Sequence, residues 1–234
     1  GIQFFIDADP QDDIDRKFRW ELVETWEYEA ENFIQYYYDG LLHEYPDPWA
    51  LFRCWKTDNI HSIFATSTYN STSTKIKRFP LNYVSNQSNR LRIKYSLLVK
   101  QYCVSDEAYE YWYQLQKQSQ ESGGFYETQP PQLTGNIYNV DDPEENVLGY
   151  FYVSSAAEKR IFVDENFLFR TPGPECILDT IQSFQKLRKL GGPYPIYLIS
   201  LSQMGTGPPY GRGWGLCFDC TTGGGTTSKP WFWE

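Results

Sequence analysis

The clearest alternation of apolar and polar side chains lies between residues 90 and 103. The apolar positions fall two residues apart, at Leu91, Ile93, Tyr95, Leu97 and Val99. Successive side chains of a strand point to opposite faces, so this spacing predicts a long strand with one buried face.

Two further strand-like segments lie near the N-terminus, at residues 3–7 and 16–28. In the second segment Phe18, Trp20 and Leu22 alternate with charged residues. The residues between them, 8–13, contain a proline and three aspartates, which favour turns. We therefore expect a β-hairpin here.

One segment has the signals of an amphipathic helix. Ser105 is a suitable N-cap, Asp106 and Glu107 stand in the first turn, and the glycines at 123–124 follow. The apolar stripe consists of Ala108, Trp112 and Leu115. These signals predict a helix over about residues 105–122.

The C-terminal part has weaker patterns. We expect a strand pair at residues 147–154 and 159–163, a helical turn within 175–190, and an irregular tail from residue 191, which is rich in Gly, Pro, Thr and Trp. The predicted fold class is α+β and β-dominated, an antiparallel β-sheet or sandwich with one main helix near 105–122 and a disulfide-pinned irregular C-terminal tail. A loop with two prolines at 45–48 suggests a boundary between residues 1–45 and 46–234.

Composition narrows the classes of function. Aromatic residues make up 18% of the chain, which favours strands. The net charge is −9 and no long basic run occurs, so binding to a nucleic-acid backbone is disfavoured. No stretch of about 18 apolar residues exists to form a membrane-spanning helix. The chain opens in strand-like sequence, so we expect its natural start to lie upstream.

The five cysteines are Cys54, Cys103, Cys176, Cys217 and Cys220. The last two have the CxxC spacing of a disulfide, redox or zinc site. Glycine-rich flanks argue against the helix that a redox site requires. With His43 and His61 as the only histidines, half of a zinc ligand set is missing. Disulfides are favoured, and they indicate an exported protein.

Candidate chemical sites are few. Asp7, Asp9, Asp12, Asp13 and Asp15 crowd one turn and form a weak calcium candidate, with a solvated loop as the alternative.

Glu21, Glu24 and Glu27 are weighed as glycosidase carboxylates, but Glu24 has the opposite strand parity to the other two. No G-x-S-x-G motif exists. We predict no catalytic, cofactor or metal residues and no enzyme.

The aromatic clusters allow three interpretations. Tyr36, Tyr37 and Tyr38, together with Trp231 and Trp233, suit contact with a partner protein. They equally suit stacking on a glycan or peptide, or packing within the chain.

An ordered set of blocks resembles one family along the chain from about residue 16 to its end. The blocks include Arg19-Trp20-Glu21, Cys54-Trp55, Tyr95-Ser96-Leu97-Leu98-Val99, Gly149-Tyr150-Phe151, Cys217-Phe218-Asp219-Cys220 and Lys229-Pro230-Trp231-Phe232-Trp233. Together they resemble the Bacteroidetes outer-membrane lipoprotein family catalogued as domain of unknown function 4249.

The resemblance carries several expectations. It implies an exported cell-surface accessory lipoprotein that docks on a TonB-dependent transporter or another outer-membrane complex. The alternative is a free-standing glycan- or peptide-binding surface protein. An upstream lipid anchor is implied, and residues 1–45 would be the end of an immunoglobulin-like β region whose start is missing. Asp179-Thr180-Ile181 resembles a Bacteroidetes O-glycosylation site at Thr180.

The resemblance also bears on the cysteines. Cys103 departs from the family pattern, which implies that it is unpaired and leaves Cys54, Cys176, Cys217 and Cys220 for bridges. We expect Cys54 to pair with Cys217 or Cys220, Cys176 to take the other, and Cys103 to be buried. A bridge between Cys217 and Cys220 is the competing option.

Overall fold

The computed structural model describes residues 1–9, 14, 16–69, 73–121, 133, 135–142, 144–145, 147, 149–164, 173 and 175–233. The strands are β1 (Ile2–Ala8), β2 (Lys17–Glu29), β3 (Tyr36–Tyr38), β4 (Leu42–Glu44), β5 (Arg53–Ser67), β6 (Ile76–Val84), β7 (Lys94–Cys103), β8 (Ser155–Val163), β9 (Asp179–Ile181), β10 (Ile196–Ser200) and β11 (Tyr210–Arg212). The α-helices are α1 (Asp106–Glu121) and α2 (Phe184–Leu187), and 3₁₀ turns lie at Asn89–Leu91, Gly215–Cys217 and Cys220–Gly223.

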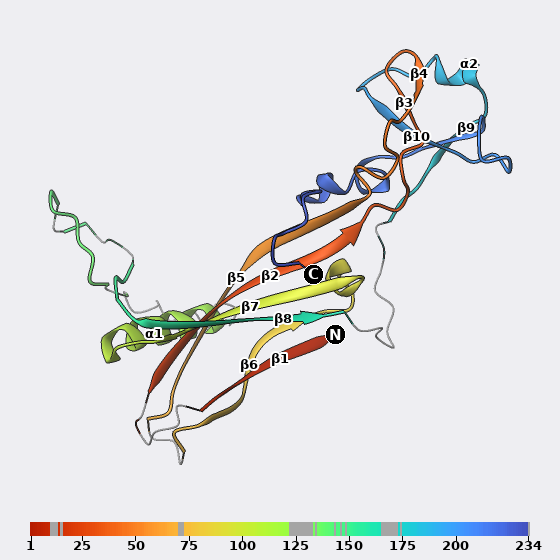
Figure 1. The fold of residues 1–234 in the computed structure, drawn as a ribbon. Helices are drawn as coiled ribbons and strands as arrows, with labels where there is room; N and C mark the ends of the chain where they lie inside the picture. The colour runs from red at the N-terminus through yellow and green to blue at the C-terminus, as the bar shows by residue number, and fades with distance from the viewer. Residues whose placement is uncertain are drawn as a thin grey trace.

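The body of the molecule is a four-stranded antiparallel sheet in the order β5-β2-β7-β8, with the β1-β6 pair against one face (Figure 1). The core lies between the two layers, where Trp20 stacks on Phe79 at 5.0 Å and Phe4 on Tyr95 at 5.6 Å. The predicted apolar faces of β2 and β7 both point into it.

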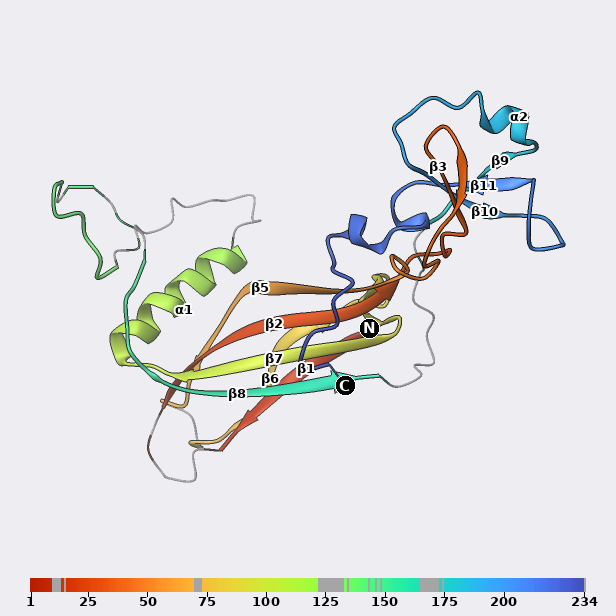
Figure 2. The same ribbon diagram turned by 45° about the horizontal axis from the view of Figure 1, so that its top comes forward.

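The opposite, outer face of this sheet is covered at both ends. Lys17 forms an ion pair with Asp106 of α1, and the Arg19 guanidinium lies over the Trp112 ring at 3.8 Å. At the far end of the strands, Trp233 donates to Glu27 from the C-terminal tail. The helix and the tail therefore lie on the same face of the sheet (Figure 2).

A smaller sheet forms a lobe beyond the end of the body that is remote from α1 (Figures 1 and 2). Its strand order is β4-β3-β10-β11-β9, all antiparallel. We call residues 33–51 and 175–218 the distal lobe. Its core contains Tyr38, Leu187, Ile196, Leu198 and Tyr210.

The fold class is confirmed: the chain is β-dominated, with antiparallel sheets, one main helix and two disulfides in the C-terminal region. The predicted helix at 105–122 is α1, and Ser105 Oγ accepts from the amide of Ala108 at 3.3 Å, as an N-cap does. Among the described residues, none of the helices has the length and apolarity needed to cross a membrane.

The predicted N-terminal hairpin is wrong. β1 pairs with β6, and β2 pairs with β5 and β7, so consecutive strands belong to different layers. Phe4 and Trp20 explain this arrangement, because each buries its ring between the two layers instead of beside the other in one sheet. The same pairings join strands from both sides of residue 45, so the chain packs continuously across that position.

The helical turn expected within residues 175–190 is present as α2, which follows β9. Two other C-terminal expectations need correction. Residues 149–154 are not a strand; the Asn136 side chain bonds the amide and carbonyl of Phe151, while β8 pairs with β7. The tail contains two strands, β10 and β11, because Ile196 and Leu198 supply a buried alternation between glycines and prolines.

The two disulfides hold the tail and the lobe. Cys54 pairs with Cys220 and Cys176 with Cys217, so each half of the CxxC pair belongs to a different bridge. Cys103 is free and half-buried, not fully buried, because it ends the strand β7.

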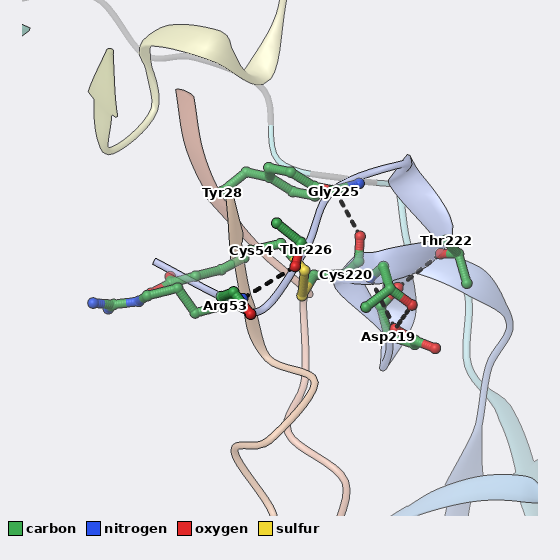
Figure 3. Close-up of a disulfide and its surroundings, with 11 residues drawn as sticks. Tyr28, Arg53, Cys54, Asp219, Cys220, Thr222, Gly225 and Thr226 are labelled. Atoms are coloured by element: carbon green, nitrogen blue, oxygen red, sulfur yellow. Dashed lines mark hydrogen bonds and ion pairs between the residues drawn. A yellow bond between two sulfur atoms is a disulfide. The ribbon is translucent and has the colours of Figure 1, made fainter. Parts of the chain in front are cut away.

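The tail makes close backbone contacts beside the Cys54–Cys220 bridge (Figure 3). The Tyr28 hydroxyl donates to the Cys220 carbonyl at 2.6 Å and accepts from the Gly225 amide at 3.0 Å. Trp55 and Thr226 exchange two backbone hydrogen bonds, both 2.9 Å long. A Cβ at Gly225 would stand 2.5 Å from the Tyr28 oxygen, so only glycine allows this approach.

Candidate docking groove on the distal lobe

A groove of about 670 Å³ crosses the distal lobe. Its lining combines aromatic rings, prolines and carboxylates: Tyr37, Asp39, Tyr45, Pro46, Asp47, Ala50, Tyr194, Pro195 and Tyr197. We call this surface the tyrosine groove.

Strand register brings three of its rings together. Tyr37 of β3 lies directly opposite Tyr197 of β10, so both side chains project from the same face of the small sheet. Tyr45 makes edge-to-face contacts with both, with ring centroids 6.1 Å from Tyr37 and 5.8 Å from Tyr197. His43 of β4 stacks on Tyr37 at 4.8 Å. The rings are therefore held in place by one another.

The structure separates the three consecutive tyrosines that the sequence singled out. Tyr37 lines the groove, whereas Tyr38 is only 3% exposed in the core of the lobe and Tyr36 packs edge-on against Tyr210. Period-two alternation in β3 explains the difference. The groove residues Tyr45, Tyr194 and Tyr197 were not among the predicted site residues.

The groove has a negative rim. Asp47 Oδ1 accepts from the Trp49 amide at 3.2 Å, and Asp39 Oδ1 lies 3.3 Å from His43 Nε2. The lining contains no lysine or arginine. Burial, together with nearby Tyr45 and Asp219, raises the pKa of the Tyr197 phenol, so this hydroxyl keeps its proton and can donate a hydrogen bond.

Other large apolar side chains are exposed on the same lobe. They are Leu41, Trp49, Ile177, Phe184, Leu201, Met204 and Trp214. Together with Tyr194, which is 48% exposed, they make the lobe a surface suited to a protein contact.

The aromatic residues of the tail have separate roles. Trp233 is 4% exposed, its Nε1 donates to Glu27 Oε2 at 3.0 Å, and its ring meets Phe162 edge-on at 5.5 Å. Trp231 is 95% exposed. Burial makes Trp233 a packing residue and leaves Trp231 as the tail aromatic accessible to a partner.

The carboxylate candidates are partly engaged within the protein. Asp7 Oδ1 accepts from the Arg78 amide at 2.5 Å, and Asp9 pairs with Lys75 at 2.6 Å. Asp12, Asp13 and Asp15 lie outside the described residues. Within the described part of the chain, no group of three or more potential metal ligands comes together.

The three glutamates of β2 do not form one site. Glu24 is buried on the inner side, where it accepts from Tyr95 and pairs with Arg90 at 2.9 Å. Burial raises the pKa of Glu24 despite these two partners. Glu21 and Glu27 face the outer side, so Glu24 cannot act with either as a catalytic pair.

A second groove, of about 450 Å³, crosses the outer face of the four-stranded sheet between α1 and the tail. We call it the sheet groove. Its polar and aromatic lining includes Arg19, Glu21, Asn59, His61, Ser62, Lys100 and Trp112.

The charged groups of the sheet groove are fixed by hydrogen bonds. Glu21 accepts from Arg19 at 2.7 Å and from Tyr102 at 2.9 Å. Burial alone would raise the pKa of Glu21, but these two bonds together with the positive charges of Arg19 and Lys100 outweigh it and leave the pKa lowered. Two buried donors, Arg19 Nε and Trp112 Nε1, have no acceptor among the described residues.

Thr180 lies exposed on β9, between Asp179, which pairs with Arg212 at 2.9 Å, and the buried Ile181. Its hydroxyl is thus on the accessible surface of the distal lobe, and its glycosylation stays a prediction.

A comparison with family models matches residues 1–160 to the domain of unknown function 4249. The matched part holds the four-stranded sheet up to β8, the β1-β6 pair, α1 and the strands β3 and β4. Searches of curated proteins and of solved structures gave no match. The chain belongs to the family described as domain of unknown function 4249.

Proposed function

We propose that this chain is a non-catalytic accessory subunit at the cell surface, which docks through its distal lobe on an outer-membrane complex such as a TonB-dependent transporter. The observation that carries the proposal is the tyrosine groove, which lies on a lobe that projects from the body and that exposes several other large apolar side chains. Aromatic side chains of this kind are enriched where proteins contact one another.

The remaining properties of the chain support an exported docking subunit. Two disulfides suit an oxidising compartment. They join the tail to β5 and to the segment before β9, which makes the lobe a rigid attachment. The outer-membrane setting, the Bacteroidetes source and the upstream lipid anchor are parts of the proposal that come from the family resemblance.

Pull-down of the native protein from detergent-solubilised membranes tests this function. We expect it to recover an outer-membrane protein, and we expect Tyr194→Ala with Trp49→Ala to reduce recovery roughly tenfold or more, as loss of central interface aromatics does. Tyr83→Ala is the matched control for Tyr194→Ala, because it removes a comparably exposed tyrosine ring from β6 on the body of the molecule. Recovery of the intact chain with no membrane protein would contradict the proposal.

The sheet groove favours a second candidate function, a free-standing binder of glycan or peptide nutrients. Arg19, Asn59, His61 and Lys100 supply polar groups beside the Trp112 ring, a combination that small-ligand sites use.

Calorimetry against oligosaccharide and peptide pools separates the two functions. A nutrient binder should release heat that Lys100→Ala removes, whereas a docking subunit should show no heat that depends on Lys100. Asp58→Ala, on β5 outside the groove, serves as the control variant.

A further inference from the structure

We propose that the tyrosine groove binds an extended, proline-rich segment of the partner that carries a lysine or arginine beside its prolines. The inference rests on the proposed docking function and names the element of the partner that the lobe recognises. It is carried by the composition of the groove, four tyrosines and two prolines with two carboxylates at the rim.

The arrangement of the rings suits proline side chains. The edge-to-face contacts of Tyr45 with Tyr37 and Tyr197 place neighbouring rings at steep angles of 88° and 85°. Rings packed in this way hold one another in place and present fixed faces and edges to the groove, on which flat, rigid pyrrolidine rings can pack. Grooves lined by aromatic residues recognise polyproline II segments in this way, because these segments are already extended and lose little entropy on binding.

The hydroxyl groups match the backbone of such a segment. A polyproline II helix makes no internal hydrogen bonds, so its carbonyls are free to accept. The Tyr197 and Tyr45 hydroxyls share a hydrogen bond in the groove, so this pair keeps one further O–H that can donate to such a carbonyl. The Tyr194 hydroxyl already donates to the Leu190 carbonyl at 2.9 Å, so this ring contributes its face instead.

The negative charge of the groove favours a lysine or arginine on the bound segment. Asp39 and Asp47 stand at the rim with no lysine or arginine in the lining, and the whole chain carries −9. A cation on the ligand gains from both carboxylates and from the electron-rich faces of the tyrosines. An acidic ligand would be repelled.

A glycan suits this groove less well than a peptide. Its lining has no asparagine, glutamine or arginine side chain to bond sugar hydroxyls, and its polar side-chain groups are phenols and two carboxylates. The rings of Tyr37, Tyr45 and Tyr197 also stand at steep angles to one another, so they form no single flat platform for a sugar ring.

The test measures binding of the intact protein to three synthetic twelve-residue peptides by tyrosine and tryptophan fluorescence. The first repeats Pro-Pro-x-Pro with one arginine, the second replaces that arginine with glutamate, and the third replaces the prolines with alanine. We expect the first to bind at least tenfold more tightly than the other two. Asp39→Asn with Asp47→Asn should weaken it roughly tenfold and remove most of its salt dependence.

Tyr194→Ala should also weaken the first peptide, while Trp231→Ala should leave it unchanged. Equal binding of all three peptides, tighter binding of a neutral oligosaccharide, or no binding of the first peptide at millimolar concentration would each overturn the inference. If the first peptide does not bind while recovery in the membrane pull-down still depends on Tyr194, the docking function is supported and the proposal of a proline-rich ligand is wrong. If the pull-down recovers nothing, the docking function itself fails.

Discussion

Replacement of both Cys54 and Cys220 by alanine is expected to lower the free energy of unfolding by about 5 kcal/mol. The bridge spans 166 residues, and cross-linking so long a loop removes much of the entropy of the unfolded chain. The tail depends on this bridge because it is rich in glycine and has few apolar side chains, whose burial would otherwise offset the conformational entropy lost when the tail becomes ordered. Urea unfolding followed by tryptophan fluorescence measures the loss.

Two variants calibrate this prediction. Loss of the Cys176–Cys217 bridge, which spans 41 residues, should cost about 4 kcal/mol on the same chain-entropy argument. Cys103→Ser should cost far less, because Cys103 is half-buried and unbridged. A loss below about 1 kcal/mol for the Cys54–Cys220 pair would show that the other contacts of the tail, among them its hydrogen bonds to Tyr28 and Trp55 and the burial of Trp233, hold it without this bridge.

The elements that could be predicted were those with a pattern of apolar and polar residues within one short segment. The strand β7 follows from alternation over ten residues, and α1 from an N-cap, two acidic residues and an apolar stripe. These signals involve neighbours in sequence, so the sequence contains all that is needed to recognise them. The conformation of each element could be predicted, but not its partner.

The pairing of strands and the tyrosine groove depend on contacts between distant residues. β1 was predicted as one strand of a hairpin with β2, yet its partner is β6, some 70 residues further on. Tyr37 and Tyr197 meet because β3 and β10 pair, and nothing near either tyrosine specifies that register. A cluster of tyrosines was visible in the sequence, but the ring that lines the groove was fixed by tertiary structure.

The two tryptophans of the tail also show that burial set by distant contacts cannot be predicted from a local motif. Trp231 and Trp233 stand two residues apart in one motif, so sequence pattern assigns both to the same class of surface aromatic. Their burial differs because the chain turns across the outer face of the sheet. The Trp233 ring packs against Phe162 and donates to Glu27, whereas the Trp231 ring points into solvent.

This difference leads to a prediction with a matched control. Trp233→Ala should lower the free energy of unfolding by about 3–5 kcal/mol, the range for deletion of a large buried aromatic side chain. It would leave a cavity against Phe162 and take from Glu27 Oε2 its indole donor, although Arg53 still lies 3.2 Å from Glu27 Oε1. Thermal and urea unfolding of the purified variant measure the loss.

Trp231→Ala removes an identical side chain two residues away and should change stability by less than about 0.5 kcal/mol, because its ring is 95% exposed. Trp233→Phe keeps one buried aromatic ring but loses the donor to Glu27 and the pyrrole part of the indole, so it gives an intermediate step between Trp233 and alanine. We expect that variant to lose about 1–2 kcal/mol. If Trp233→Ala cost as little stability as Trp231→Ala, the tail would not be anchored on the sheet through Trp233.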